Sequence, residues 1–259
     1  MKSIESLLSK YNPQSEISLL NREGKAKVSP ETIFIIKKAK EFYRASEGAF
    51  DVTVGSLLKL WGFDTRNYRV PTQDEIKRIL ELVGSDKILL DEEKQIVEFQ
   101  KKGMLLDLGA IAKGYAVDCA IKKLKEKKIK NALINAGGDI YCLGDKFGNF
   151  WQVGIRDPSK KKIRKVIKLR DKAVATSGDY ESYFLKDKKT YGHIFDPRTG
   201  FPIESGISSV TVIADDCLTA DALATAVFVL GLEKSKSLMK RYNANIEDIV
   251  FKIMERENG

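Results

Sequence analysis

Histidine and cysteine are scarce in this chain. Its 259 residues include one histidine and three cysteines, and Cys119, Cys142 and Cys217 are far apart with no Cys-x-x-Cys pair. So few nitrogen and sulfur ligands argue against a structural zinc site, which takes four Cys or His side chains. The odd number of cysteines also argues against a disulfide framework.

Long apolar runs are missing as well. No stretch of the sequence is apolar over the length that a membrane span needs, and the N-terminus has no hydrophobic signal-peptide region. From the sequence as given, we expect a soluble, cytoplasmic protein.

Acidic residues are fewer than basic ones. The chain has 45 Lys and Arg against 36 Asp and Glu, a net charge of +9, and a basic surface attracts anions. Lysines cluster at 122–128, 160–168 and 186–189, but few aromatic residues are interleaved and no nucleic-acid motif is present. This pattern favours solvated loops and helix faces, so we expect no nucleic-acid partner.

Local patterns predict a mixture of helices and strands. Capping residues and apolar periodicity predict helices at 1–11, 30–46, 71–84, 108–127 and 219–230, and then a last helix and strand. Short apolar runs predict strands at 87–90, 95–99, 104–107, 131–135, 151–155, 163–169, 173–176, 183–185 and 208–214. Because no regular βαβ repeat emerges, the predicted class is α+β, in one domain over 1–259.

The single histidine lies in a polar, turn-rich segment. Residues 191–202 read Tyr-Gly-His-Ile-Phe-Asp-Pro-Arg-Thr-Gly-Phe-Pro, and His193 is the one side chain whose unperturbed pKa is near neutral. The composition favours a rigid loop that holds polar groups. The alternative is a turn with an incidental surface histidine.

Two glycine-containing segments follow predicted strands. Asp107-Leu-Gly-Ala-Ile-Ala-Lys113 enters a helix, where first-turn amides and Lys113 could hold an anion, although neither a Walker A loop nor Gly-x-Gly-x-x-Gly is present. The alternative is an ordinary helix start with Asp107 near its cap. Gly137 and Gly138 allow positive φ or close ligand approach, and the alternative is a tight turn.

Two further pairs of side chains could take part in binding. Asp221 and Thr225 are four residues apart on one helix face and could give oxygen ligands to Mg²⁺. The alternative is that they serve only the helix, through its dipole and a main-chain carbonyl. Trp61 and Phe63 flank Gly62 and suit a flat ring, with core packing as the alternative.

The order of the motifs is more specific than any one of them. It runs Ser-Glu-Ile-Ser-Leu-Leu-Asn at 15–21, Gly-Ala-Phe-Asp-Val at 48–52, Trp-Gly-Phe at 61–63, Asp-Leu-Gly-Ala-Ile-Ala-Lys-Gly-Tyr at 107–115, Asn-Ala-Gly-Gly-Asp at 135–139, Thr-Ser-Gly at 176–178, His-Ile-Phe-Asp-Pro-Arg-Thr-Gly at 193–200 and Asp-Ala-Leu-Ala-Thr at 221–225. Over almost its whole length the chain closely resembles the ApbE family of flavin transferases. The resemblance implies a mixed, largely antiparallel sheet with packed helices and an FAD cleft.

The resemblance also implies a reaction and a set of site residues. Family members bind FAD and Mg²⁺ and transfer FMN to a threonine hydroxyl of an acceptor flavoprotein, with AMP as the leaving group. By motif match, His193 is the catalytic residue, and Mg²⁺ is bound by the carbonyl of Ala110 and the side chains of Asp221 and Thr225. FAD contacts are implied for Tyr11, Trp61, Gly62, Phe63, Asp107, Lys113, Gly137, Gly138 and Ile194.

The chain departs from the family pattern at its N-terminus, and rival functions stay open. Family members usually carry an export or lipoprotein signal and then a strand with Met-Gly-Thr, whereas this chain begins at what looks like the following helix. Membrane association is therefore expected only through an N-terminal anchor missing from this sequence or through a membrane-bound acceptor. The rival functions are an Mg²⁺-dependent FAD pyrophosphatase, a non-catalytic FAD-binding protein and a basic nucleic-acid binder.

Overall fold

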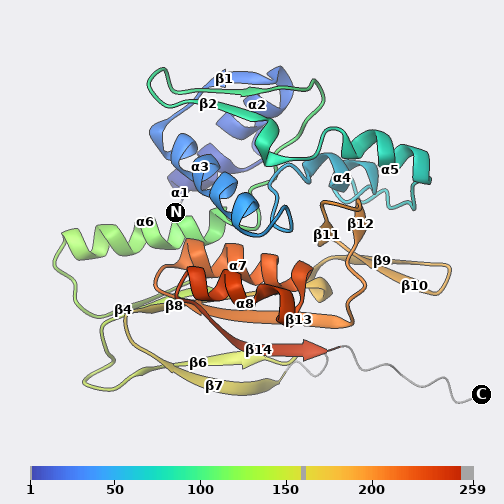
Figure 1. The fold of residues 1–259 in the computed structure, drawn as a ribbon. Helices are drawn as coiled ribbons and strands as arrows, with labels where there is room; N and C mark the ends of the chain where they lie inside the picture. The colour runs from blue at the N-terminus through green and yellow to red at the C-terminus, as the bar shows by residue number, and fades with distance from the viewer. Residues whose placement is uncertain (1, 159–161, 252–259) are drawn as a thin grey trace, which may run out of the picture.

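A computed structural model describes residues 2–158 and 162–251 of the chain, and Figure 1 shows its ribbon. The α-helices are α1 (Lys2–Leu8), α2 (Glu16–Glu23), α3 (Pro30–Ala45), α4 (Gly55–Leu60), α5 (Gln73–Leu80), α6 (Ala112–Glu126), α7 (Cys217–Leu230) and α8 (Leu232–Arg241). The strands are β1 (Lys25–Lys27), β2 (Ile88–Asp91), β3 (Ile96–Phe99), β4 (Ala132–Ala136), β5 (Asp139–Leu143), β6 (Trp151–Arg156), β7 (Ile163–Leu169), β8 (Lys172–Gly178), β9 (Tyr183–Lys186), β10 (Lys189–Gly192), β11 (Phe195–Asp196), β12 (Phe201–Pro202), β13 (Ile207–Ala214) and β14 (Asn245–Phe251). The short 3-10 helices are η1 (Ser85–Lys87) and η2 (Asp179–Glu181).

A five-stranded antiparallel sheet forms the centre of the fold, in the order β14-β13-β8-β5-β4. In Figure 1, α6, α7 and α8 lie on one side of this sheet and the β6–β7 hairpin lies on the other. Alternation along β8 explains both contacts: Ala173 and Ala175 join the main core, while Val174 joins a second cluster with Val153 and Ile167 of the hairpin. The α+β, largely antiparallel prediction is confirmed.

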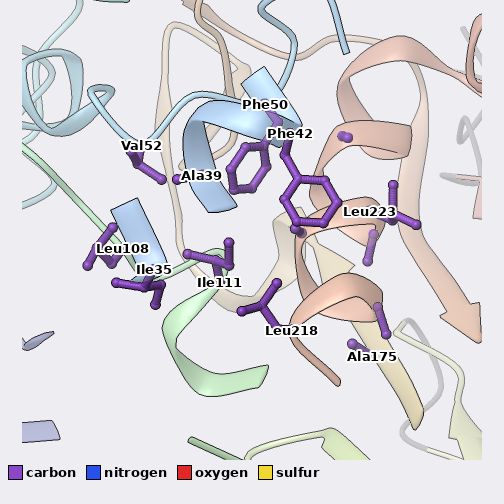
Figure 2. Close-up of a cluster of buried hydrophobic side chains, with 14 of the residues drawn as sticks. Ile35, Ala39, Phe42, Phe50, Val52, Leu108, Ile111, Ala175, Leu218 and Leu223 are labelled. Atoms are coloured by element: carbon purple, nitrogen blue, oxygen red, sulfur yellow. The ribbon is translucent and has the colours of Figure 1, made fainter. Parts of the chain in front are cut away.

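The main hydrophobic core joins segments that are far apart in the sequence. Figure 2 shows the place where α3, the segment after it, the start of α6, α7 and β8 meet. The labelled side chains are Ile35, Ala39, Phe42, Phe50, Val52, Leu108, Ile111, Ala175, Leu218 and Leu223. Because these side chains are buried against one another, they fix the position of α6 relative to α7. These two helices carry the candidate site.

Local caps explain several helix boundaries. Ser29 caps α3 by accepting from the Thr32 amide, with Pro30 as the first helical residue, so this predicted helix is confirmed. At α7, the Asp216 side chain accepts from the Thr219 amide. Gly231 follows the end of α7 with a φ of 76°, which glycine adopts readily.

The predicted elements are confirmed in part. The antiparallel hairpin of β2 and β3 was expected, and so was α6, although that helix begins at Ala112 rather than at 108. The strand predicted at 104–107 is wrong, since this segment makes only an isolated bridge between Val54 and Leu105. Sequence patterns missed two helices, α2 and α4, and the strands β1, β5, β10, β11 and β12.

Two further expectations concern the lysine clusters and membrane-spanning helices. Lys160 and Lys161 of the predicted lysine cluster lie outside the described residues. Among helices in the described ranges, none combines the length and apolar character that a bilayer crossing requires.

Candidate functional site

A buried charge cluster joins α6, α7 and the start of β5. The Lys113 Nζ lies 2.9 Å from Asp139 Oδ2 and 3.9 Å from Asp221 Oδ1. Asp139 is 1% exposed and Asp221 is 3% exposed, whereas half of the Lys113 side chain reaches solvent. The cluster therefore places two buried carboxylates under one partly exposed cation.

The cluster depends on a close approach of α6 to α7. The Gly114 amide donates to Asp221 Oδ2 at 3.1 Å. A Cβ at Gly114 would lie 2.3 Å from the carbonyl oxygen of Cys217, so only glycine fits there. The close approach at Gly114 is thus made by the packing of α6 on α7.

The two carboxylates affect each other. Burial raises the pKa of Asp221, the neighbouring Asp139 carboxylate raises it further, and Lys113 opposes both effects. Burial also raises the pKa of Asp139, against the effect of Lys113. Burial is the larger cause of both shifts, and a bound cation would favour the charged form of each carboxylate.

The oxygen donors in this region suit Mg²⁺. Thr225 lies one turn after Asp221 on α7, and its Oγ1 is 2.9 Å from Ser177 Oγ on β8. Ala110 precedes α6 by two residues, in the same junction as Gly114. A carboxylate, a hydroxyl and a main-chain carbonyl are hard oxygen ligands of the kind Mg²⁺ prefers. Within 2–158 and 162–251 no group of three or more His, Cys, Asp or Glu side chains is arranged to hold a metal, so the candidate set is this mixed one.

Asp107 anchors the loop that precedes α6. Its Oδ1 accepts from the Gly109 amide at 2.8 Å, and its Oδ2 lies 2.8 Å from Lys10 Nζ. Lys10 also pairs with Asp64. Burial acts to lower the pKa of Lys10, but Asp107 and Asp64 together raise it well above its ordinary value.

The predicted aromatic contact Tyr11 follows Lys10 directly. Its side chain is 75% exposed, and the Lys10 ammonium lies 5.0 Å from its ring centroid. The structure therefore brings Tyr11 close to Asp107, through Lys10, and leaves its ring open to solvent.

The aromatic loop 61–63 contacts the histidine loop. Trp61 is 0% exposed, and its Nε1 donates to the carbonyl of Gly200 at 3.1 Å. A Cβ at Gly62, where φ is 83°, would lie 1.9 Å from the Asn67 carbonyl oxygen. The partly buried Phe63 meets Phe195 edge-on at 5.8 Å between ring centroids. Core packing thus describes Trp61, and the predicted FAD contacts of this loop stay predictions.

His193 is oriented by a main-chain carbonyl. Its Nδ1 lies 3.0 Å from the carbonyl oxygen of Ser182, which also accepts from the His193 amide. Since a carbonyl only accepts, Nδ1 is the protonated nitrogen of the neutral ring, and Nε2 carries the lone pair. The geometry thus provides a proton acceptor at Nε2.

Hydrogen bonds tie the loop after His193 together. Arg198 donates to both carboxylate oxygens of Asp196 at 2.8 Å, and the Gly200 amide donates to the Asp196 carbonyl at 2.8 Å. Ile194 is buried, and its carbonyl accepts from the Ile203 amide at 2.9 Å. These hydrogen bonds agree with the expectation of a rigid polar loop, and Ile194 is buried within it.

Gly137 and Gly138 form the turn between β4 and β5. Their φ values are 65° and 105°, and the Gly138 amide donates to Asn135 Oδ1 at 2.9 Å. Nothing lies within 4 Å of a Cβ built at either residue, so the turn geometry and not crowding calls for glycine. The tight-turn alternative describes this segment, and ligand approach stays a prediction.

The histidine loop and Thr225, one of the metal-binding candidates, both contact the end of β8 or the residues just after it. Ser177 contacts Thr225, and two residues later the side chain of Asp179 lies against Gly192, where a Cβ would be 3.0 Å away. His193 follows Gly192. Tyr11 and Asp107 are grouped separately around Lys10.

Sequence reasoning missed three groups. Asp139 follows the paired glycines directly. Its position after this turn could have marked it as a candidate site residue. No sequence signal identifies the Ser182 carbonyl, because it acts through the main chain. Lys10 likewise depends on contacts between distant segments.

Comparison with known proteins agrees with this arrangement. Residues 1–250 match the ApbE family. An FAD:protein FMN transferase of Haemophilus influenzae is 33% identical, covering 100% of this chain and 77% of its own length; one of Treponema pallidum is 37% identical, covering 92% and 71%. The crystal structure of the ApbE protein of Thermotoga maritima has a TM-score of 0.87 at 39% identity, covering 97% of this chain and 86% of its own. The chain belongs to the ApbE family.

Proposed function

We propose that this protein is an Mg²⁺-dependent FMN transferase, which moves FMN from FAD to a threonine hydroxyl of an acceptor flavoprotein and releases AMP. The relatives named FAD:protein FMN transferase support the reaction class. The observation that carries the proposal is the orientation of His193, since the Ser182 carbonyl holds Nδ1 and leaves Nε2 as the base.

The residues of the histidine loop suit the attack on phosphorus. The threonine oxygen forms a bond to the phosphorus of the FMN moiety, and the bond from that phosphorus to the bridging oxygen breaks, so AMP leaves. His193 Nε2 accepts the hydroxyl proton. General-base help of this kind contributes about 10²–10⁴-fold to a rate.

The charge cluster suits the pyrophosphate of FAD. Lys113 is half exposed above the two carboxylates, so its ammonium can reach a phosphate oxygen. Ala110, Asp221 and Thr225 would hold Mg²⁺, which when bound neutralises charge on the pyrophosphate. Asp139 is the nearer carboxylate to the Lys113 Nζ, at 2.9 Å against 3.9 Å for Asp221, so it holds the ammonium and leaves Asp221 for the cation.

The remaining predicted contacts belong to the flavin and adenine ends of FAD. We assign direct contacts to Tyr11, Gly62, Phe63, Asp107, Gly137, Gly138 and Ile194, and an indirect role to Trp61. The exposed Tyr11 ring offers a stacking surface, while the buried Trp61 acts by supporting the histidine loop.

Intact-mass analysis tests the reaction. A synthetic peptide that contains Asp-x-x-Thr is incubated with the protein, FAD and Mg²⁺, and we expect the mass of FMN to be added to the threonine. A matched peptide with alanine in place of that threonine should gain nothing. Free FMN and AMP in the absence of peptide, with no modified peptide in its presence, would indicate a pyrophosphatase instead.

A further inference from the structure

The β9–β10 hairpin projects from the body of the protein. In Figure 1 it extends away from the central sheet, and within the described residues β9 and β10 pair only with each other. Asp187 and Lys188 connect them with φ values of 50° and 61°, the backbone sign of a tight type I′ turn. The outer edges of this hairpin therefore lack strand partners in the described part of the chain.

The root of the hairpin belongs to the candidate site. Ser182, which orients His193, immediately precedes β9, and Gly192 at the end of β10 immediately precedes His193. Phe184 is buried and stacks on Tyr191 at 5.1 Å between centroids. One face of the hairpin is thus fixed to the aromatic cluster beside the histidine loop.

The other face is apolar and open. Tyr183 and Leu185 alternate with the buried Phe184, and they are 52% and 68% exposed. In the antiparallel register Leu185 lies opposite Thr190 and Tyr183 lies opposite Gly192, so this face runs continuously toward His193.

The tip of the hairpin is basic. Lys186 and Lys188 are exposed, and in the described part of the chain neither forms an ion pair, whereas Lys189 pairs with Glu204 at 2.6 Å. Asp187 lies between these two lysines, so residues 186–189 carry a net positive charge of two. An apolar strip that begins at the proposed base and ends at this positive tip would complement an extended segment with an apolar and then an acidic part.

We propose that the β9–β10 hairpin docks the acceptor polypeptide as an extended segment, with its acidic residues at the tip and its threonine at His193. This inference rests on the proposed function for the identity of the partner. An unpaired strand edge can bind an extended segment through main-chain hydrogen bonds, while side-chain contacts supply specificity. From Gly192 to Lys188 is four residues, roughly 13 Å of extended chain. The acidic residues of the segment are then expected about four to six residues from the threonine.

Binding and transfer are measured with matched synthetic peptides. Each has one central threonine and two Asp, two Ala or two Lys residues placed four to six positions away. Fluorescence anisotropy gives the Kd for the FAD-bound protein, and mass analysis gives the rate of FMN addition. We expect the Asp peptide to bind at least about tenfold more tightly than the Lys peptide, and we expect Lys186→Glu with Lys188→Glu to reverse that order.

Control variants separate docking from other effects. Lys146→Glu with Lys168→Glu makes the same charge change at exposed residues of the β5–β6 loop and β7, and it should leave the peptide preference unchanged. Leu185→Ser should weaken binding of all peptides several-fold, while Leu89→Ser, at another exposed leucine on β2, should not. FAD affinity should be equal in all of these variants.

Each outcome decides between the two proposals. Equal Kd values for the three peptides, or no measurable binding, would overturn the docking role. Charge-dependent binding without FMN addition would support docking and overturn the transferase. FMN addition that is insensitive to both hairpin variants would support the transferase and overturn docking.

Discussion

The ammonium of Lys113 and the carboxylate of Asp139 lie 2.9 Å apart, with Asp139 buried and Lys113 half exposed. The second carboxylate, Asp221, is 3.9 Å from the same nitrogen. Asp139 therefore competes with Asp221 for Lys113, and in doing so it leaves Asp221 available for the proposed Mg²⁺.

The Asp139→Asn variant should need more Mg²⁺ to bind FAD. Without its charged partner, Lys113 would move toward Asp221 and compete with the cation. We expect the Mg²⁺ concentration that gives half-maximal FAD binding to rise about tenfold, which corresponds to roughly 1.4 kcal/mol. Flavin fluorescence measures the binding. Asp215→Asn, which removes an exposed carboxylate paired with Lys172, is the control. An unchanged midpoint in Asp139→Asn would show that Asp139 has no influence on the metal.

The Asp221→Ala variant should show a stronger effect than Asp139→Asn. It removes a proposed ligand and also leaves the Gly114 amide without its acceptor. We expect the Mg²⁺ requirement for transfer to rise sharply, with a smaller effect in Thr225→Ala because a neutral hydroxyl attracts a cation less than a carboxylate does. Titration of initial rates with Mg²⁺ measures both, and unaltered Mg²⁺ dependence would contradict the assignment.

The His193→Ala variant should lose transfer and keep FAD binding. Removing the base should slow FMN addition about 10²–10⁴-fold. His193→Asn is the matched control for this hydrogen bond, since its Nδ2 takes the place of the ring Nδ1 and can still donate to the Ser182 carbonyl but cannot accept the proton at neutral pH. Wild-type rates in either variant, measured by peptide mass, would mean that another group takes the proton.

Asp118 should make stability depend on pH. Its carboxylate accepts from the Cys217 and Leu218 amides, both at 2.8 Å, at the start of α7. Burial raises its pKa to about 6, against the effect of those hydrogen bonds. The folded state therefore holds a proton more tightly than the unfolded chain, and this contribution to stability is lost as pH rises through about 6.

The Asp118→Asn variant isolates that contribution. Relative to the variant, the wild type should gain about 1 kcal/mol in free energy of unfolding when the pH falls from 7.5 to 5. Urea unfolding at both pH values measures the difference, since the other titrating groups cancel between the two proteins. Parallel pH profiles would rule out Asp118 as the source.

The Gly114→Ala variant should be destabilised, although alanine normally favours a helix. The new methyl group would lie 2.3 Å from the Cys217 carbonyl oxygen and push α6 from α7. We expect a loss of about 1–3 kcal/mol, with weaker FAD binding because Asp221 is displaced. Lys122→Ala, on an exposed part of the same helix, should be neutral within about 0.5 kcal/mol.

Local signals predicted much of this fold. Ser29 with Pro30 marks the start of α3, and Gly231 marks the end of α7, because each acts within one or two turns. The strand β5 was missed because its five residues are all buried, so it shows no alternation. The segment 104–107 has the composition of a strand, but the fold gives it no strand partner beyond the single bridge.

The site was predictable where residues are close in sequence. Asp221 and Thr225 share a helix face by spacing alone, and His193 is the one residue of its kind. The contact of Lys113 with Asp139 joins a helix to a strand 26 residues away, and only packing establishes it. The orienting carbonyl of Ser182 carries no side-chain signature at all.

The hydrogen bond from Trp61 to Gly200 has a spectroscopic consequence. The chain has two tryptophans, and the other, Trp151, lies on the β6–β7 hairpin across the sheet. After Trp151→Phe, the remaining indole emission should come from Trp61, which is hydrogen-bonded directly to the histidine loop. Its wavelength and lifetime would then record, in the unlabelled protein and during turnover, whether that loop stays in place or shifts.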